Sequence, residues 1–194
     1  MTRAPGESRP ESNDAAPPGA ATRPIFLIGM MGSGKSTVGR RLAARLGRRF
    51  LDADKVLVER CGVPISTIFE LEGEEGFRRR EAALLDELSQ LPSIVLATGG
   101  GAVMREENRR MLAGRGLVVF LHAALPDLWQ RLRRDRARPL LQTENPREQL
   151  ATLLALREPL YREIAAITVV SARQPVDELV ADIIGRLPDE LRAD

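Results

Sequence analysis

The chain of 194 residues contains a single cysteine, a single histidine, a single tyrosine and a single tryptophan. Cys61 cannot form a disulfide within the chain, which favours a reducing, cytoplasmic environment. Aromatic residues make up only 4% of the sequence, too few for the stacking surfaces that hold single-stranded nucleic acid. No apolar run approaches the roughly 20 residues that a membrane-spanning helix needs. We therefore expect a cytoplasmic protein with no nucleic-acid partner and no membrane segment.

Lysine is also scarce. Lys35 and Lys55 are the only two, so arginine supplies nearly all of the positive charge. The formal net charge is only +2, because acidic residues are interspersed throughout the chain. Arginines that converge on one cleft suit the forked recognition of carboxylates and phosphates. The length suits one domain with a substantial core.

The beginning of the chain differs in composition from the rest. Residues 1–23 are rich in Pro, Gly, Ala and Ser without apolar periodicity, which predicts a disordered tail. From Ile25 on, short apolar runs alternate with amphipathic stretches, a pattern typical of a parallel sheet covered by helices. We expect one α/β domain over 24–188 and a C-terminal tail over 189–194. The expected strands are 24–28, 50–51, 94–97, 117–121 and 167–170, and the expected helices are 35–46, 55–60, 65–71, 73–90, 106–113, 126–135, 146–164 and 175–186.

The most informative motif is Gly29-Met30-Met31-Gly32-Ser33-Gly34-Lys35-Ser36, which fits the pattern G-x-x-x-x-G-K-[ST] between an apolar strand and an amphipathic helix. Such a turn directs backbone N–H groups and the positive end of the helix dipole to one point, where phosphate oxygens bind. Lys35 can then reach the β- and γ-phosphates, and the Ser36 hydroxyl can ligate Mg²⁺. The motif predicts binding of a nucleoside triphosphate. The residues expected to contact ATP here are Gly32, Ser33, Gly34, Lys35, Ser36 and Thr37.

Two further segments follow the second and third expected strands, at the edge where sheets of this kind bind ligands. In Leu51-Asp52-Ala53-Asp54, alternation along an extended segment would place both carboxylates on the same side. Asp52 would hold Mg²⁺ and Asp54 would face a nucleophilic hydroxyl, unless Asp54 merely caps the next helix. The glycines of Thr98-Gly99-Gly100-Gly101-Ala102 either form a flexible turn or let the backbone approach a ligand and offer N–H donors.

With these segments and three others, the chain resembles the shikimate kinase family from about Ile25 to Leu187. The others are Phe77-Arg78-Arg79-Arg80-Glu81, Arg138-Pro139-Leu140-Leu141 and Arg157-Glu158-Pro159-Leu160-Tyr161. The resemblance implies a P-loop NTPase-type three-layer α/β fold, with a central parallel sheet of about five strands, helices on both faces and a mobile lid. It also implies a monomeric cytoplasmic enzyme of aromatic amino acid biosynthesis, which phosphorylates the 3-hydroxyl of shikimate with ATP and Mg²⁺.

The resemblance also implies a role for individual residues. Asp54 is the implied base, and Lys35 and the lid residue Arg138 would neutralise charge during transfer. Ser36 and Asp52 would hold Mg²⁺. Residues implied to contact shikimate are Asp54, Arg78, Glu81, Gly99, Gly100, Gly101 and Arg157. Residues implied to lie beside ATP, outside the loop, are Arg131, Arg138 and Arg173.

Two other functions stay open. Another small-molecule P-loop kinase, acting on gluconate or a nucleotide, would share the phosphate motif, although Arg78 and Arg157 suit a small carboxylated acceptor. A non-catalytic nucleotide-binding protein or a nucleic-acid binder would be expected to lack a catalytic residue, and none is missing. We expect structural roles for His122, at the end of a strand, and for Trp129, at the edge of the core.

Overall fold

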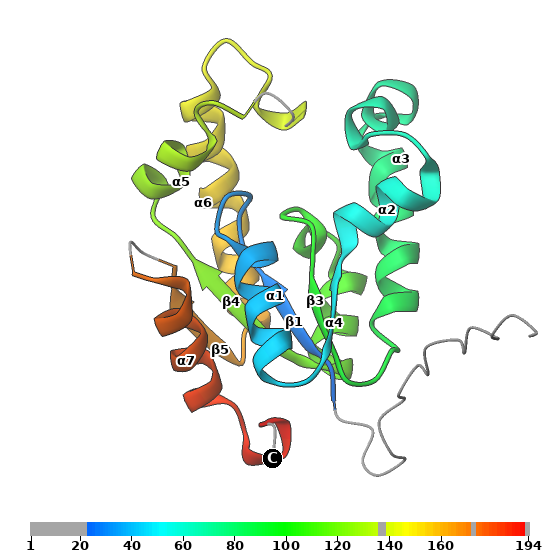
Figure 1. Ribbon diagram of the computed structural model, residues 1–194. Coiled ribbons are helices and arrows are strands. Elements are labelled where there is room, and N and C mark those ends of the chain that lie inside the picture. The colour runs from blue at the N-terminus through cyan, green and yellow to red at the C-terminus, as the bar shows by residue number, and fades with distance from the viewer. Residues whose placement is uncertain (1–22, 136–138, 172–173, 193–194) are drawn as a thin grey trace, which may run out of the picture.

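The computed structural model of this chain describes residues 23–135, 139–171 and 174–192. Its described residues form one five-stranded sheet, in which all strands are parallel and the order is β2-β3-β1-β4-β5 (Figure 1). This confirms the α/β fold with a central parallel sheet expected from the sequence. The strands are β1 (Ile25–Ile28), β2 (Arg49–Asp52), β3 (Ile94–Ala97), β4 (Leu117–His122) and β5 (Ile167–Val170).

Helices connect successive strands and flank the sheet. The described α-helices are α1 (Lys35–Arg45), α2 (Ala53–Cys61), α3 (Ile65–Leu88), α4 (Glu106–Arg115), α5 (Leu125–Leu132), α6 (Pro146–Ile164) and α7 (Val176–Arg186). The two helices expected over 65–71 and 73–90 are continuous except for a break at Gly73, where φ is 68° and ψ is −178°. This left-handed φ favours glycine and turns the chain between the two halves of α3.

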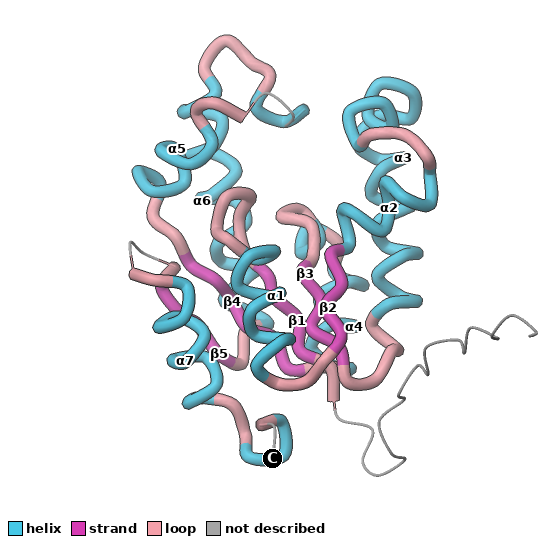
Figure 2. The backbone as a smooth tube through the Cα atoms, in the orientation of Figure 1, coloured by secondary structure: helices cyan, strands magenta, loops and turns pink. Residues whose placement is uncertain are grey.

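Each strand presents alternate side chains to the two faces of the sheet. Ile25 and Leu27 pack in a core cluster with residues of α1 and α7, whereas Phe26 and Ile28 pack in a second cluster with residues of α3, α4 and α6. Figure 2 shows the strands lying between these helical layers. Burial of both faces explains why the three central strands, β1, β3 and β4, are nearly continuous apolar runs rather than alternating ones.

The last described residues pack on the domain. The segment expected as a tail over 189–194 contains a short 3₁₀ helix, Asp189–Leu191, and the Leu191 side chain is buried in the core cluster beside α1 and α7. Arg48 Nη2 donates to the Leu191 carbonyl at 2.9 Å. The apolar contact and this hydrogen bond hold the segment in place, so residue 188 does not mark the end of the packed structure.

The parallel arrangement brings the carboxyl ends of all five strands to one edge of the sheet, at the upper end of the molecule in Figure 1. The segments that follow the five strands meet at that edge and supply the residues of the site described below. Among the helices of the described residues, none is both long enough and apolar enough to cross a membrane.

Two helical glycines provide a test of how closely α1 packs on the sheet. A Cβ at Gly39 of α1 would lie 2.5 Å from Phe50 Cε2 and 2.9 Å from Leu27 Cδ1, whereas a Cβ at Gly185 of α7 would meet no described atom within 4 Å. We expect Gly39→Ala to lower the free energy of unfolding by about 1–3 kcal/mol through overpacking. Gly185→Ala should raise it by about 0.5–1 kcal/mol through helix propensity. Urea denaturation measures both, and equal effects would contradict the packing.

Candidate active site

The phosphate loop, Gly29–Ser36, connects β1 to α1 and depends on its glycines. Gly29, Gly32 and Gly34 have φ values of 142°, 79° and 92°, which other residues rarely adopt. A Cβ at Gly29 would also lie 2.6 Å from the carbonyl oxygen of Leu121. Because α1 begins at Lys35, its first backbone N–H groups open toward the loop. The geometry predicted from the motif is therefore present, with a helix N-terminus at the end of a tight glycine turn.

Two side chains of the phosphate loop are already oriented by hydrogen bonds. Lys35 Nζ donates to the carbonyl oxygens of Gly29 at 2.8 Å and Met30 at 2.9 Å, which folds the ammonium group over the loop. Ser36 Oγ donates to Asp52 Oδ2 at 2.6 Å. The hydroxyl and carboxylate proposed from the sequence as metal ligands thus lie in contact, although they come from different elements.

Ser36 and Asp52 fit a Mg²⁺ ion that arrives with a nucleotide. Mg²⁺ prefers oxygen ligands, and in nucleotide sites it is usually held by one or two protein groups together with phosphate oxygens and water. Among the described residues, no three or more His, Cys, Asp or Glu side chains lie together in a group that could hold a metal ion. The hydroxyl–carboxylate pair suits shared coordination rather than a metal held by protein alone.

Asp52 rather than Asp54 caps α2. Asp52 is the last residue of β2, and its Oδ1 accepts a hydrogen bond from the Lys55 backbone N–H at 3.4 Å. Asp54 lies in the first turn of α2. The expectation of two carboxylates on one extended segment is wrong in this respect, because the helix begins directly after the strand. The alternative that Asp54 serves only as a cap is wrong as well.

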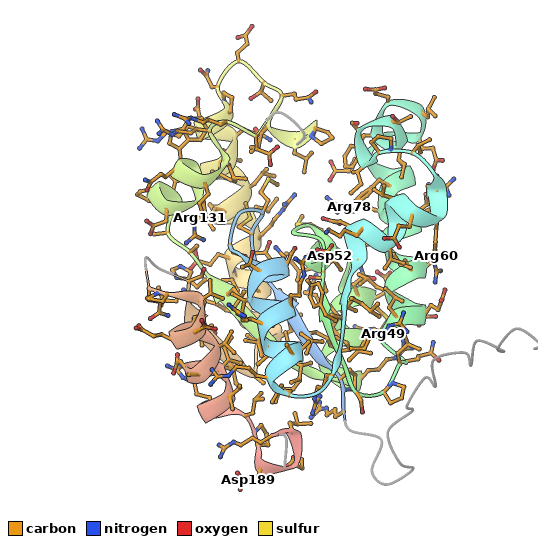
Figure 3. All side chains as sticks on the ribbon, in the orientation of Figure 1. Arg49, Asp52, Arg60, Arg78, Arg131 and Asp189 are labelled. Atoms are coloured by element: carbon orange, nitrogen blue, oxygen red, sulfur yellow. The ribbon has the colours of Figure 1, made fainter. Side chains whose placement is uncertain are left out.

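A cavity of about 620 Å³, the larger cavity, opens beside the phosphate loop and is also lined by Asp52, Asp54 and Arg131. Arg131 of α5 donates from Nη1 to the Gly32 carbonyl at 2.9 Å and from Nη2 to the Ser171 carbonyl at 3.2 Å. Ser171, directly after β5, donates from Oγ to the Ser33 carbonyl at 2.7 Å. Arg131 and Ser171 thus brace the phosphate loop. Figure 3 shows Arg131 on the side of the molecule opposite Arg78 and Asp52.

A second cavity of about 60 Å³, the smaller cavity, adjoins the larger one. Both cavities are lined by Met31, Asp54, Ile65 and Gly100, so Asp54 lies where they adjoin. All the residues that the family resemblance implied for acceptor contacts line the smaller cavity together. They are Asp54, Arg78, Glu81, Gly99, Gly100, Gly101 and Arg157.

Three charged side chains are buried around the smaller cavity. Arg78 donates from Nη1 to Glu81 Oε2 at 2.7 Å and from Nη2 to Glu74 Oε1 at 3.0 Å. In the described part of the chain, Arg157 Nε, Arg157 Nη1 and Glu81 Oε1 are buried without a hydrogen-bond partner. Burying guanidinium N–H groups without an acceptor is costly. These nitrogen atoms are therefore suited to an anion that enters the cavity.

The surroundings alter the acid–base properties of this cluster. Burial raises the pKa of Glu81, although the positive charge of Arg78 opposes the rise. Burial lowers the pKa of Arg157, and the like charge of Arg78 contributes to this lowering. For Arg78, burial alone would lower the pKa, but the carboxylates of Glu81 and Glu74 together raise it. The cluster thus holds Arg78 charged and makes an anion beside Arg157 favourable.

The glycine loop, Thr98–Ala102, lies in close contact with the buried side chains of Glu81 and Arg78. A Cβ at Gly99 would overlap Glu81 Oε1, and a Cβ at Gly101 would overlap the guanidinium of Arg78. The glycines therefore leave room for the buried charges, in addition to exposing backbone N–H groups. The alternative of a merely flexible turn does not account for this close approach.

The remaining expectations have mixed outcomes. Arg138 and Arg173 lie outside the described residues, so the lid stays a prediction, although Pro139 and Leu140 line the smaller cavity. His122 Nε2 lies 3.3 Å from Glu158 Oε1 at the end of β4, a contact that agrees with a structural role. Trp129 packs against the edge of the core as expected. Ser171 was missed because no motif surrounds it.

Comparisons with known proteins agree with this geometry. A family model described as "Shikimate kinase" matches residues 31–188. A shikimate kinase of Thioalkalivibrio sulfidiphilus is 56% identical over 162 residues, which cover 84% of this chain and 85% of the relative. One of Bordetella avium is 52% identical over 164 residues, covering 84% of this chain and 78% of the relative.

Solved structures give the same result. The structure described as shikimate kinase from Acinetobacter baumannii in complex with shikimate has a TM-score of 0.83 and 45% identity, and the match covers 86% of this chain and 96% of that one. A gluconokinase from Sinorhizobium meliloti has a TM-score of 0.55 at 24% identity, covering 82% of this chain and 88% of that one. The second likeness concerns the fold alone.

The two buried guanidinium nitrogen atoms of Arg157 that lack a hydrogen-bond partner lead to a prediction about stability. Arg157→Met keeps a long side chain but removes a buried charge, so we expect the free energy of unfolding without ligands to rise by about 1 kcal/mol or more. Arg109→Met is the matched control, because Arg109 donates to the Val103 carbonyl at 2.8 Å and to Glu163 Oε1 at 3.1 Å. That variant should be less stable than the parent. Urea denaturation measures both, and destabilisation by Arg157→Met would show that its charge is satisfied.

Proposed function

This chain belongs to the shikimate kinase family, and we propose that it transfers the γ-phosphoryl group of ATP to the 3-hydroxyl of shikimate in the biosynthesis of aromatic amino acids. The products are ADP and shikimate 3-phosphate. The observation that carries the proposal is the junction of the two cavities at Asp54. A nucleotide bound at the phosphate loop and an acid held in the smaller cavity would meet at that carboxylate.

The acceptor is proposed to bind through its carboxylate. The Nε and Nη1 N–H groups of Arg157 are buried without an acceptor, so they can donate to the oxygens of a carboxylate that enters the cavity. Arg78 lies in the same cavity and is held in position by Glu81 and Glu74. An anchored carboxylate would fix the ring, so that one hydroxyl faces Asp54 and the phosphate loop.

The nucleotide is proposed to bind in the larger cavity with its phosphates on the N–H groups of the phosphate loop. Lys35 would exchange its two carbonyl partners for phosphate oxygens, a change in partner that needs little movement. Ser36 and Asp52 would hold Mg²⁺ together with the phosphates. When bound there, the ion would neutralise phosphate charge. Arg131 and Ser171 would keep the loop in shape on the nucleotide side.

In the transfer step, Asp54 would accept a hydrogen bond from the acceptor hydroxyl and take its proton. The hydroxyl oxygen forms a bond to the γ-phosphorus while the bond to the β–γ bridging oxygen breaks, and ADP leaves. We keep Arg138 as the residue proposed to close over the phosphates, and Arg173 as a neighbour of the adenine. We further propose that the enzyme acts as a cytoplasmic monomer, since one chain lines both cavities.

Replacing the proposed base tests the mechanism. Asp54→Asn keeps the size of the side chain but removes the proton acceptor, and general-base catalysis is worth roughly 10²–10⁴-fold. We expect kcat to fall by about that factor while the dissociation constant for ATP, measured by calorimetry, stays nearly unchanged. A kcat within about threefold of the parent, well below that range, would remove Asp54 from the mechanism.

Replacing Arg78 tests the acceptor in an ADP-release assay with shikimate, quinate and gluconate as candidate substrates. The parent should release ADP most efficiently with shikimate. In Arg78→Lys, a single ammonium group replaces the two parallel N–H donors of the guanidinium. KM for shikimate should therefore rise by about tenfold or more. KM for ATP should stay within about twofold, because Arg78 is not part of the phosphate loop.

The matched control for that experiment is Arg79→Lys, because the Arg79 side chain is exposed and points away from the cavity, as its 66% exposure indicates. It should behave like the parent. An equal rise in KM for ATP and shikimate in Arg78→Lys would instead mean that Arg78 supports the whole domain. Faster turnover of gluconate than of shikimate by the parent enzyme would overturn the proposed acceptor.

A further inference from the structure

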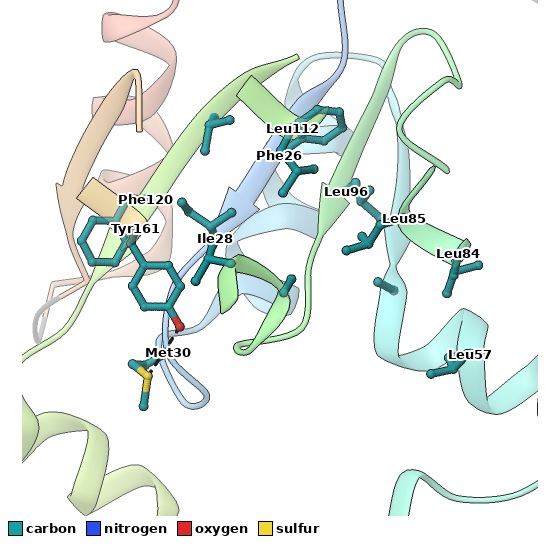
Figure 4. Packing of buried hydrophobic residues seen from close by; sticks show 14 of the residues in the cluster. Phe26, Ile28, Met30, Leu57, Leu84, Leu85, Leu96, Leu112, Phe120 and Tyr161 are labelled. Atoms are coloured by element: carbon teal, nitrogen blue, oxygen red, sulfur yellow. Dashed lines mark hydrogen bonds between the residues drawn. The ribbon is translucent and has the colours of Figure 1, made fainter. Parts of the chain in front are cut away.

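Tyr161, the only tyrosine of the chain, is fully buried behind the site. It lies in α6 one turn beyond Arg157, and its ring stacks on Phe120 of β4 with a centroid distance of 5.0 Å and an interplanar angle of 27°. Figure 4 shows the ring among the apolar side chains of the core, with its hydroxyl pointing toward Met30. The ring is therefore held by packing, which leaves the hydroxyl in a defined position.

That hydroxyl contacts both loops of the site. It donates to the carbonyl oxygen of Gly100 at 2.5 Å, and it lies 3.5 Å from the sulfur of Met30. Gly100 belongs to the glycine loop and Met30 to the phosphate loop. The two loops also touch directly, since a Cβ at Gly100 would lie 3.1 Å from the backbone nitrogen of Met31. A small rotation in the glycine loop would therefore alter the junction between the cavities.

The glycine loop has an internal backbone hydrogen bond from the Ala102 N–H to the Gly99 carbonyl at 3.2 Å, whereas the bond that holds the Gly100 carbonyl comes from Tyr161, outside the loop. The ends of the loop are fixed, because the Thr98 N–H donates to the Leu27 carbonyl at 3.1 Å and Asn108 Nδ2 donates to the Ala102 carbonyl at 2.9 Å. Between them stand three consecutive glycines, whose backbone dihedrals are the least restricted of any residue. The peptide unit between Gly100 and Gly101 is planar, so its carbonyl oxygen and its N–H group point in opposite directions. Holding the carbonyl also directs the N–H.

We propose that Tyr161 is a positioning residue for phosphoryl transfer, whose hydroxyl locks the Gly100–Gly101 peptide and thereby aims the Gly101 N–H into the acceptor side of the site. The proposal rests on the proposed function, because it concerns how the shikimate cavity is shaped. The ring itself packs among apolar side chains, and besides the two loops its hydroxyl interacts with Arg157. Burial raises the pKa of Tyr161, although the charge of Arg157 opposes this, so the hydroxyl keeps its proton for donation.

Tyr161→Phe tests the lock, because it keeps the stacked ring and removes only the hydroxyl. We expect KM for shikimate to rise about three- to tenfold, the equivalent of one hydrogen bond. KM for ATP should stay within about twofold, since the phosphate loop has its own braces in Arg131 and Ser171. The matched control is Ser89→Ala, which removes a buried hydroxyl at the far end of α3, where Ser89 Oγ donates to the Asp86 carbonyl at 3.2 Å. That control should lose some thermal stability and keep both KM values.

Hydrogen exchange on the ligand-free proteins provides a second readout that does not depend on activity. Backbone amides of residues 99–102 should exchange faster in Tyr161→Phe than in the parent and in Ser89→Ala, while those of residues 32–36 stay the same. Unchanged exchange and kinetics with a lowered Tm would assign Tyr161 to packing alone. An equal rise in both KM values would overturn a role confined to the glycine loop. If the parent enzyme leaves shikimate unphosphorylated, the proposed function fails, and the exchange comparison still decides whether the hydroxyl locks the loop.

Discussion

Burying three charged side chains beside a sheet edge is the constraint around which the acceptor side of this protein is organised. Arg78, Glu81 and Arg157 are each less than 7% exposed, and moving charges out of water is costly unless they are paired. Arg78 and Glu81 pair with each other, but Arg157 Nε and Nη1 are left without a hydrogen-bond partner among the described residues. These N–H groups of Arg157 can therefore recognise an acid, because its carboxylate supplies the missing acceptor when it enters the cavity.

The surrounding backbone is adapted to these side chains. Gly99 and Gly101 lack the Cβ atoms that would overlap Glu81 and Arg78. The phosphate loop then lies against the glycine loop at Met31. Each loop is braced by residues distant in sequence, which for the phosphate loop are Arg131 and Ser171. Tertiary contacts, rather than local turn geometry alone, therefore keep the two cavities aligned.

Much of this arrangement could be predicted from the sequence. Apolar runs located all five strands, and the rule that parallel strands end at one edge predicted that Asp54 and Gly100 would approach the phosphate loop. The first turn of α2 was harder, since β2 runs into the helix without an intervening turn residue, and Asp52 takes the cap instead of Asp54. The contacts of Ser171 and Tyr161 could not be predicted, because each joins segments that are remote in sequence and no periodicity encodes such a pair. Packing of Leu191 was missed because a three-residue helix carries no readable pattern.

The scarcity of lysine has a practical consequence for chemical labelling. The chain has two lysines, and both Lys35 and Lys55 line the larger cavity. Apart from the amino terminus, every primary amine of this protein therefore borders the place where a nucleotide would bind, while the rest of its positive charge is carried by guanidinium groups. Acylation of the two lysines would therefore report on that cavity. Their protection from the reagent would measure how much of the cavity is occupied by a ligand, without any engineered probe.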